Sequence, residues 1–272
     1  MAKNFIKMHG LGNDFAIFDS RKESLHFSPD QIRKLANRHF GIGFDQMVVI
    51  DTPKSPESDV FLRIYNADGS EVGACGNATR CVGKLLMAEL KKPEIVLETS
   101  AARLTAKMAG DLVCVDMSKA KLRHEEIPLS NEEKTESLPI NEGVLKYPVA
   151  VNMGNPHAVF FVDDVAMVPL EFLGPKIESH PLFPEHTNVE IAQVLSPTKI
   201  RMRVWERGAG ITQACGTGAC ATAVAGVRRG LTERKVTIVL DGGTLDIEWR
   251  ESDGHVLMTG DAVEVYRGTV EI

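Results

Sequence analysis

The sequence predicts an α/β protein, more narrowly α+β, built from two similar halves in which strands surround one central helix. Short runs of β-branched and aromatic residues fill most of the chain. The tripeptide Ala-Cys-Gly, followed by Asn or Thr, occurs twice, within 73–81 (GACGNATRC) and 213–220 (QACGTGAC). An apolar stretch suited to a buried helix follows each copy. The repeat therefore predicts two related halves.

In the first half, six runs have the composition of strands, at 5–8, 15–19, 47–51, 60–65, 95–98 and 112–116. Ser28-Pro29-Asp30-Gln31 has capping-box spacing with proline at the first helical position, which predicts a helix over 29–39 that stops before Gly41. A second helix is expected from about Gly76, because apolar residues recur at helical spacing from Ala78 to Leu86. Cys75 then stands at its N-terminus.

The second half repeats this order. Strands are predicted at 147–153, 158–162, 189–194 and 199–205, with a short helical piece near 170–179. Residues 218–227 are apolar on every face, which predicts a helix wrapped by sheet. The tail, 235–272, is expected to form strands separated by turns at 241–243 and 252–254. The polar segment 117–143 is interpreted as the connection between the halves.

Composition excludes several classes of function. The chain has 272 residues, 43% hydrophobic and 25% charged, and no apolar run approaches the roughly 18 residues of a membrane span. Residues 1–7 lack a secretory apolar segment, so we expect a cytoplasmic protein without membrane partners. The net charge of −6 (31 basic, 37 acidic residues) leaves no basic stripe for nucleic acid. A small-molecule partner is the better prediction.

The five cysteines suggest free thiols rather than a structural framework. Their number is odd and no C-x-x-C pair occurs, so disulfides and a metal site are not expected. Cys81, Cys114 and Cys220 lie inside apolar runs and are interpreted as packing residues. Cys75 and Cys215 differ, because each precedes a glycine at a predicted helix start.

A thiol at a helix N-terminus meets unpaired N–H groups and the positive end of the helix dipole, which predicts a pKa lowered from about 8.5 toward neutrality. Gly76 and Gly216 would let a ligand carboxylate approach the same N–H groups. Two such helix starts suit a reaction in which one thiolate removes a proton from carbon while the opposite thiol delivers one to the other face. The outcome is inversion of a stereocentre.

Other polar residues could complete such a site, although each has a structural explanation too. Glu206-Arg207, before a Gly-Ala-Gly loop, is a candidate clamp for an amino acid, yet taken alone it is an ordinary solvated ion pair. His157 follows an Asn-Pro turn. Uncharged amides at predicted strand ends or turns are explained equally well by turn chemistry; they are Asn13, Gln46, Asn66 and Asn188.

No cofactor is expected. The paired glycines at 10–12, 41–43, 208–210 and 216–218 lack the third glycine of a dinucleotide fingerprint, and no phosphate-loop lysine motif or zinc-protease motif occurs. A carbanion would then depend on the dipoles of the site and on exclusion of water.

Taken in order, the motifs resemble the diaminopimelate epimerase family over nearly the whole chain. They are His9-Gly10-Leu11-Gly12-Asn13-Asp14-Phe15, Gly41-Ile42-Gly43-Phe44-Asp45-Gln46, Tyr65-Asn66-Ala67-Asp68-Gly69-Ser70, Ala74-Cys75-Gly76-Asn77, Asn155-Pro156-His157, Glu206-Arg207-Gly208-Ala209-Gly210 and Ala214-Cys215-Gly216-Thr217-Gly218. The resemblance implies two pseudo-symmetric domains with mostly antiparallel, barrel-like sheets. It places the first domain at 1–118, joined by a returning strand at 264–272, and the second at 119–263.

The resemblance also implies an activity: cofactor-independent interconversion of L,L- and meso-diaminopimelate, a precursor of lysine and peptidoglycan, by a homodimer. Cys75 and Cys215 would transfer the protons, and His157 and Glu206 would tune them. Tyr266 matches a position associated with dimerisation. The implied substrate-binding residues are Asn13, Gln46, Asn66, Gly76, Asn77, Asn155, Asn188, Glu206, Arg207, Gly216 and Thr217.

The chain departs from the family pattern in two places. Ala78-Thr79 stands where the family often has Gly-Ala, and Ile211 and Gln213 stand where Glu and Leu are common. Neither departure touches a proton-transfer group.

Two alternatives stay open at this point. A related two-cysteine racemase or epimerase would act on proline or hydroxyproline, which lacks the second charged end that the many polar anchors suit. A thiol redox switch is the alternative from another class, because two reactive thiols can oxidise to a disulfide.

Overall fold

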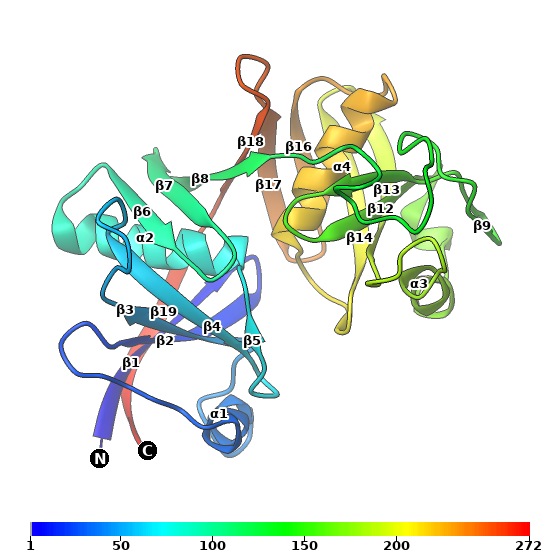
Figure 1. Cartoon of the computed structure of the whole chain (residues 1–272). Coiled ribbons are helices and arrows are strands. Elements are labelled where there is room, and N and C mark those ends of the chain that lie inside the picture. The colour runs from blue at the N-terminus through cyan, green and yellow to red at the C-terminus, as the bar shows by residue number, and fades with distance from the viewer. Residues whose placement is uncertain (1) are drawn as a thin grey trace. The chain divides into compact units, whose positions relative to one another are not determined.

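Each half of the chain builds a sheet around one helix (Figure 1). The computed structural model describes residues 2–272. The helices are α1 (Pro29–Ala36), α2 (Gly76–Leu90), α3 (Leu170–Glu178) and α4 (Gly216–Arg228), with a 3-10 turn η1 (Val165–Met167). The first-half strands are β1 (Ala2–Gly10), β2 (Asn13–Asp19), β3 (Gln46–Asp51), β4 (Val60–Asn66), β5 (Glu71–Val72), β6 (Glu94–Glu98), β7 (Arg103–Ala109) and β8 (Leu112–Lys119). The later strands are β9 (Asn141–Glu142), β10 (Leu145–Lys146), β11 (Val149–Asn152), β12 (Pro156–Phe161), β13 (Asn188–Ser196), β14 (Lys199–Glu206), β15 (Gly210–Ile211), β16 (Lys235–Leu240), β17 (Gly243–Trp249), β18 (His255–Gly260) and β19 (Val263–Glu271).

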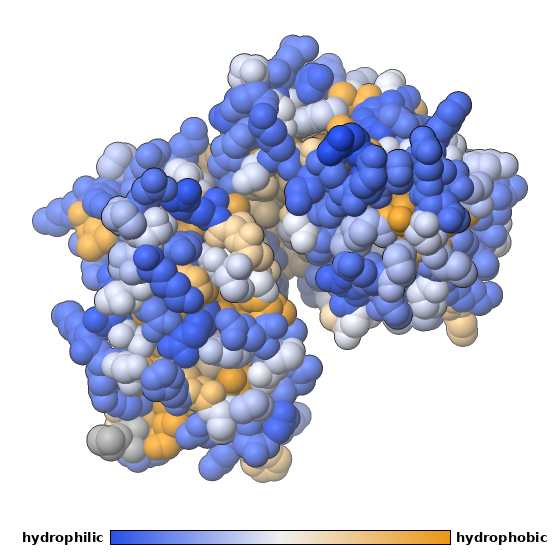
Figure 2. All heavy atoms as spheres, viewed as in Figure 1, coloured by the Kyte–Doolittle hydropathy of each residue, from blue (hydrophilic) through white to orange (hydrophobic). Residues whose placement is uncertain are grey.

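The chain divides into two units. Unit 1 comprises residues up to 115 together with 259–272, and unit 2 comprises 116–258. In unit 1 the C-terminal strand β19 pairs antiparallel with β1, from Ala2 opposite Glu271 to His9 opposite Val263. In the view of Figure 2, hydrophilic residues cover most of the visible surface of both units, with smaller apolar patches.

The two units repeat one strand order. In unit 1, each of the strands β1 to β4 pairs with the next one, β4 also pairs with β6, and β6 pairs with β7. Of these five pairs, β2–β3 and β4–β6 are parallel and the other three are antiparallel. Unit 2 has the same series, with β11 to β14 followed by β16 and β17, and again only the second and fourth pairs are parallel. The predicted fold of two similar, mostly antiparallel halves is confirmed.

Each repeat encloses its helix. The strands β1, β2, β6 and β7 contact α2, whereas β11 to β14, β16 and β17 contact α4. Ten of the thirteen residues of α4 are buried, which explains why its sequence is apolar on every face. The flanks of both helices are therefore covered by strands.

The start of α1 follows the predicted capping box, but the helix ends three residues early. Ser28 Oγ accepts from the Gln31 N–H (3.2 Å), and Gln31 Oε1 accepts from the Ser28 N–H (2.8 Å). The predicted end at residue 39 is wrong, because Asn37 Oδ1 accepts from the N–H groups of His39 and Phe40 (2.9 and 3.0 Å). These bonds replace the next helical turn.

Three other expectations need correction. The strand predicted over 147–153 is interrupted at Tyr147, whose φ of +50° is incompatible with a strand, and only Val149–Asn152 extends. Strand β7 was not predicted, because Leu104 and Ala106 are its sole buried residues. The segment 117–143 is more than a connection, since Ile127, Leu138 and Ile140 are buried in the core of unit 2.

The packing of α2 against β7 generates a stability prediction. A Cβ on Gly83 would lie 2.6 Å from the Ala106 Cβ. Alanine has the better helix propensity, but overpacking outweighs it, so Gly83→Ala is expected to lower the free energy of unfolding by about 1–3 kcal/mol. Urea unfolding measures the change.

The double variant Gly83→Ala/Ala106→Gly is the control. If the contact is responsible, it is more stable than the sum of the two single substitutions predicts. Strict additivity would contradict the packing explanation.

Candidate active site

Each predicted proton-transfer cysteine is the N-cap of the central helix of its unit. Cys75 precedes α2 and Cys215 precedes α4, both with extended backbone at the cap. The N–H groups of the first helical turn have no partner inside a helix, and Gly76 and Gly216 occupy its first position. None of the five cysteines in the described chain forms a disulfide. Both predicted helix starts are confirmed.

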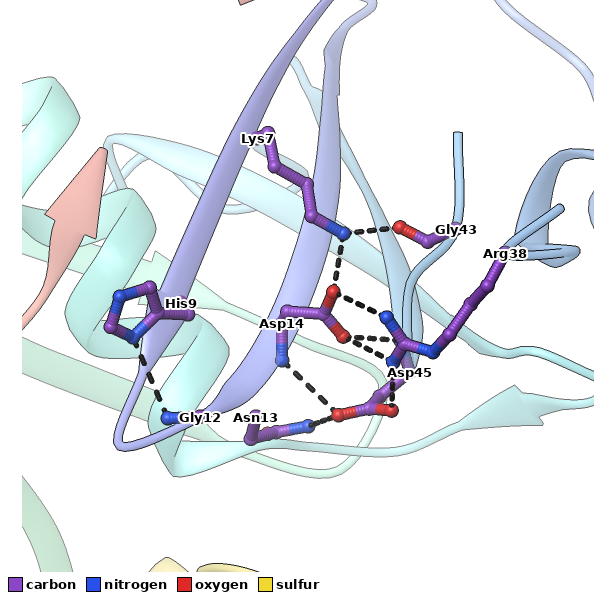
Figure 3. Close-up of polar contacts among 8 residues, drawn as sticks. All are labelled: Lys7, His9, Gly12, Asn13, Asp14, Arg38, Gly43 and Asp45. Atoms are coloured by element: carbon purple, nitrogen blue, oxygen red, sulfur yellow. Dashed lines mark hydrogen bonds and ion pairs between the residues drawn. The ribbon is translucent and has the colours of Figure 1, made fainter. Parts of the chain in front are cut away.

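In unit 1, a charged network holds Asn13 in place (Figure 3). Asn13 Nδ2 donates to Asp45 Oδ2 (3.2 Å). The Arg38 guanidinium donates to Asp45 and Asp14 (2.7 and 2.8 Å), and the buried Lys7 ammonium pairs with Asp14. Burial alone would raise the pKa of Asp14, but Arg38 and Lys7 outweigh it and lower that pKa to about 2. The network fixes which way the Asn13 amide points.

The Asn13 carbonyl oxygen consequently faces the start of α2. It accepts from Asn77 Nδ2 at 3.1 Å and lies 3.9 Å from the Cys75 sulfur, which donates to it. Cys75 is partly exposed, whereas Gly76 and Asn77 are buried. The thiol of Cys75 therefore stands beside oriented amide groups.

Gln46 and Asn66 form a second amide pair at the same end of the unit 1 sheet. They are cross-strand neighbours of β3 and β4, and Gln46 Nε2 donates to Asn66 Oδ1 (3.0 Å). Asn66 Nδ2 donates in turn to Ser70 Oγ (3.1 Å). All six unit 1 residues predicted to transfer protons or bind substrate thus lie at strand ends or at the start of α2; they are Asn13, Gln46, Asn66, Cys75, Gly76 and Asn77.

In unit 2, the sulfur of Cys215 is buried at the start of α4. It accepts from the Gly218 N–H (3.4 Å) and lies 3.5 Å from Thr217 Oγ1. Burial raises the pKa of Cys215 well above its ordinary range, and the carboxylates of Glu206 and Glu190 raise it further. The Thr217 and Gly218 hydrogen bonds oppose this shift without cancelling it. The expected lowering of the pKa at a helix start is therefore wrong for Cys215.

Glu206 lies at the end of β14, next to this cysteine. Its carboxylate accepts from Thr212 Oγ1 and from the Cys215 thiol. Burial raises the pKa of Glu206, and these hydrogen bonds act against that rise. The arrangement couples a buried thiol to a half-buried carboxyl group.

The loop Asn155–Pro156 and the loop that carries Arg207 are tied together by Asn188. Its side chain donates to the Pro156 carbonyl (2.9 Å) and accepts from the Arg207 N–H (2.9 Å). Asn188 is only 3% exposed. Both ends of this amide are engaged within unit 2, and its role in substrate binding stays a prediction.

His157, predicted to tune the cysteines, is completely buried in β12. Its Nε2 lies 2.9 Å from Asn155 Oδ1, and its Nδ1 lies 2.7 Å from Glu190 Oε1. Glu190 was not predicted as a site residue. The signal in the sequence was a glutamate flanked by the apolar residues Val189 and Ile191, a setting where an unpaired carboxylate is unfavourable.

Arg207 and Tyr266 are exposed. The Arg207 guanidinium donates to the Glu185 carbonyl (2.9 Å), and Tyr266 packs edge-on against Phe5 with ring centroids 5.9 Å apart. Among residues 2–272, no helix is both long enough and apolar enough to span a bilayer.

Two repeats with a cysteine at the start of each central helix define a class of α/β protein, and solved structures share this fold. A Bacillus anthracis phenazine biosynthesis protein of the PhzF family is 15% identical, with a TM-score of 0.71 and full coverage of both chains. An Agrobacterium vitis hydroxyproline epimerase is 15% identical, with a TM-score of 0.70 over 99% of this chain and 92% of its own. Identity this low establishes the fold alone.

Sequence comparison is more specific. The family model described as "Diaminopimelate epimerase" matches residues 5–123 and 149–265. A diaminopimelate epimerase of Rhodospirillum centenum is 52% identical over 98% of this chain and 92% of the relative. One of Phenylobacterium zucineum is 51% identical over 98% of both. The chain belongs to the diaminopimelate epimerase family.

The contact between the Cys215 thiol and the Glu206 carboxylate leads to a prediction. Replacing Glu206 with glutamine removes a negative charge beside the sulfur, so the pKa of Cys215 should fall and its alkylation should begin at lower pH. Because burial remains, the pKa stays above that of an exposed cysteine. The rate of iodoacetamide labelling of the Cys215 peptide, followed by mass spectrometry against pH, measures the shift.

Glu185→Gln is the matched control, since it makes the same charge change at an exposed position in the same unit. Its labelling curve should match that of the unsubstituted protein. An unchanged curve for Glu206→Gln would contradict the assigned coupling.

Proposed function

We propose that this protein is a diaminopimelate epimerase that interconverts L,L- and meso-diaminopimelate without a cofactor. The observation that carries the proposal is the pair of cysteines at N-caps of equivalent helices, in a chain that belongs to this family. Family membership favours this activity over proline or hydroxyproline chemistry. The hydroxyproline epimerase neighbour has only 15% sequence identity and supports the fold alone.

The reaction needs one base and one acid on opposite faces of the same α-carbon. One thiolate removes the α-proton, and the other thiol delivers its own proton to the opposite face, so the two sulfurs exchange roles in each turnover. The raised pKa of Cys215 supports its assignment as the protonated donor before catalysis, which leaves Cys75 as the first base. Cys75 suits that role because it is more exposed and lies beside the first-turn N–H groups of α2, which have no intrahelical partner.

The substrate has two amino acid ends, and we propose that the polar residues of the site divide between them. The first-turn N–H groups at Gly76 and Gly216 suit the carboxylate at the reacting carbon, because helix starts bind anions. The exposed Arg207 guanidinium suits a carboxylate by a two-point contact. The amides of Asn13, Gln46 and Asn66 suit the ammonium groups as acceptors.

Deuterium exchange tests the function directly. In deuterated water, L,L-diaminopimelate should gain one deuterium at one α-carbon while the meso isomer forms, because the donor thiol exchanges with solvent. Mass spectrometry with chiral separation follows both events. An absence of exchange by reduced protein would exclude the proposed reaction, and greater turnover of proline would favour the alternative substrate.

Cys75→Ala and Cys215→Ala are the matched variants for this experiment. Each removes one of the two proton-transfer groups, so each should lose epimerisation. Cys114→Ala changes a buried cysteine outside both helix starts and should retain it. Turnover near the unsubstituted rate in either N-cap variant would remove that cysteine from the mechanism.

We also propose that the protein is a homodimer formed through β19. The support is that three apolar side chains on that strand are exposed, namely Val263, Val265 and Tyr266. Tyr266→Glu places a charge in the contact and should convert dimer to monomer in analytical ultracentrifugation. Phe172→Glu, an equally drastic change at an exposed residue of unit 2, should leave the mass unchanged. A monomeric unsubstituted protein would contradict this proposal.

A further inference from the structure

Unit 2 contains a polar pair that is completely buried, His157 and Glu190. Both side chains are 0% exposed, and His157 Nδ1 lies 2.7 Å from Glu190 Oε1. Two ionisable groups in a sheet interior carry a desolvation penalty that an apolar pair of similar volume avoids. The retention of this pair therefore needs a reason.

The equivalent positions of unit 1 show that the fold does not require the pair. Phe15 is paired with the first residue of β3, just as His157 is paired with the first residue of β13. Two residues further along those strands lie Val48 and Glu190. Phe15 and Val48 are both 0% exposed and apolar. The equivalent layer therefore contains two apolar side chains in unit 1 and a histidine with a glutamate in unit 2.

The helix against this layer differs in a matching way. Ala78 follows the first two residues of α2, whereas the corresponding residue of α4 is Gly218. A Cβ on Gly218 would lie 2.7 Å from Glu190 Oε1 and 3.3 Å from the Cys215 sulfur. The glycine makes room for the carboxylate directly beside the reactive end of α4.

Hydrogen-bond geometry indicates the protonation state of His157. Its Nδ1 faces a carboxylate oxygen and its Nε2 faces the Asn155 amide oxygen (2.9 Å). A neutral imidazole donates from only one ring nitrogen, whereas an imidazolium donates from both. In the described chain, Glu190 Oε2 has no hydrogen-bond partner, so a positively charged His157 ring at Oε1 would offset the charge of this carboxylate.

The charge of the pair extends to the cysteine through Glu206. Burial raises the pKa of Glu206 and the negative charge of Glu190 adds to that rise, whereas a positive charge on His157 works against it. Glu206 in turn accepts from the Cys215 thiol. Glu190 and His157 therefore both act on the carboxylate that accepts from the sulfur, and unit 1 has apolar residues in the corresponding sheet layer.

We propose that Glu190 is a positioning residue that holds His157 as a doubly protonated imidazolium, and that this ring offsets the negative charge of Glu190 beside Glu206, so that Glu206 stays an anion able to accept from the Cys215 thiol. The catalytic part of this inference rests on the proposed epimerase function. The arrangement of Glu190, His157 and Glu206 gives Cys215 an electrostatic environment that Cys75 does not share. The reaction therefore begins with Cys215 as the proton donor.

The protonation state can be observed without any substrate. In protein labelled with ¹⁵N-histidine, both ring nitrogens of His157 should carry protons at the pH of the activity assay, because each faces an acceptor oxygen. The ring-nitrogen signals that disappear in His157→Phe identify those of His157 among the eight histidines. In Glu190→Gln, His157 should show one unprotonated nitrogen at the same pH.

Activity provides the second readout. Glu190→Gln is expected to lower kcat on diaminopimelate by roughly tenfold or more with little change in KM, because Glu190 does not touch substrate. The double variant His157→Phe/Glu190→Val copies the unit 1 pair, so it should fold and also be slow. Circular dichroism and thermal unfolding verify its folding.

Two results would overturn the proposal. An unprotonated Nδ1 in the unsubstituted protein would mean that the proton resides on Glu190, and a kcat within about twofold in folded Glu190→Gln would mean that the pair is dispensable. Failure of the proposed function is distinguishable, because diaminopimelate would then not turn over at all while the histidine spectra still report on the pair.

Discussion

Enclosure of each central helix by its sheet is the constraint on which the site depends. Strands cover the flanks of α2 and α4, so a ligand can approach those helices through an end. The N-terminal end offers N–H groups without intrahelical partners together with the positive end of the dipole. A cysteine at the cap therefore combines a proton-transfer group with an anion-binding surface, and the same solution occurs twice in one chain.

The repeat is an architectural one, and the chemistry of the two copies has diverged. Cys75 is partly exposed beside the neutral amides of Asn13 and Asn77, whose orientation is fixed by a surrounding charged network. Cys215 is buried between carboxyl groups. A helix dipole favours the thiolate in both places, but desolvation is the larger effect at Cys215. The balance of these two effects cannot be read from an Ala-Cys-Gly motif, because the motif does not specify burial.

Much of the fold follows from local patterns in the sequence. The Ser28 capping box, the apolar periodicity after Gly76 and the wholly apolar stretch of α4 each correspond to an observed element. Prediction fails where a single side chain redirects the backbone, as Asn37 does, or where a strand buries as little as β7 does. The site residues could be proposed from their motifs. Glu190 could not be proposed in this way, since its role depends on contact with His157, 33 positions away in the sequence.

The pairing of β1 with β19 joins the two ends of the chain along eight residue pairs. Unit 2 is contiguous in sequence, whereas unit 1 needs residues from both termini. During synthesis, unit 2 can therefore acquire its full set of contacts while the outer edge of β1 still awaits its last partner. The β1–β19 pairing spans most of the chain, and such long-range contacts carry the greatest loop-closure cost in folding. Completion of the sheet that supports Cys75 thus waits for a segment that is synthesised after the whole of unit 2.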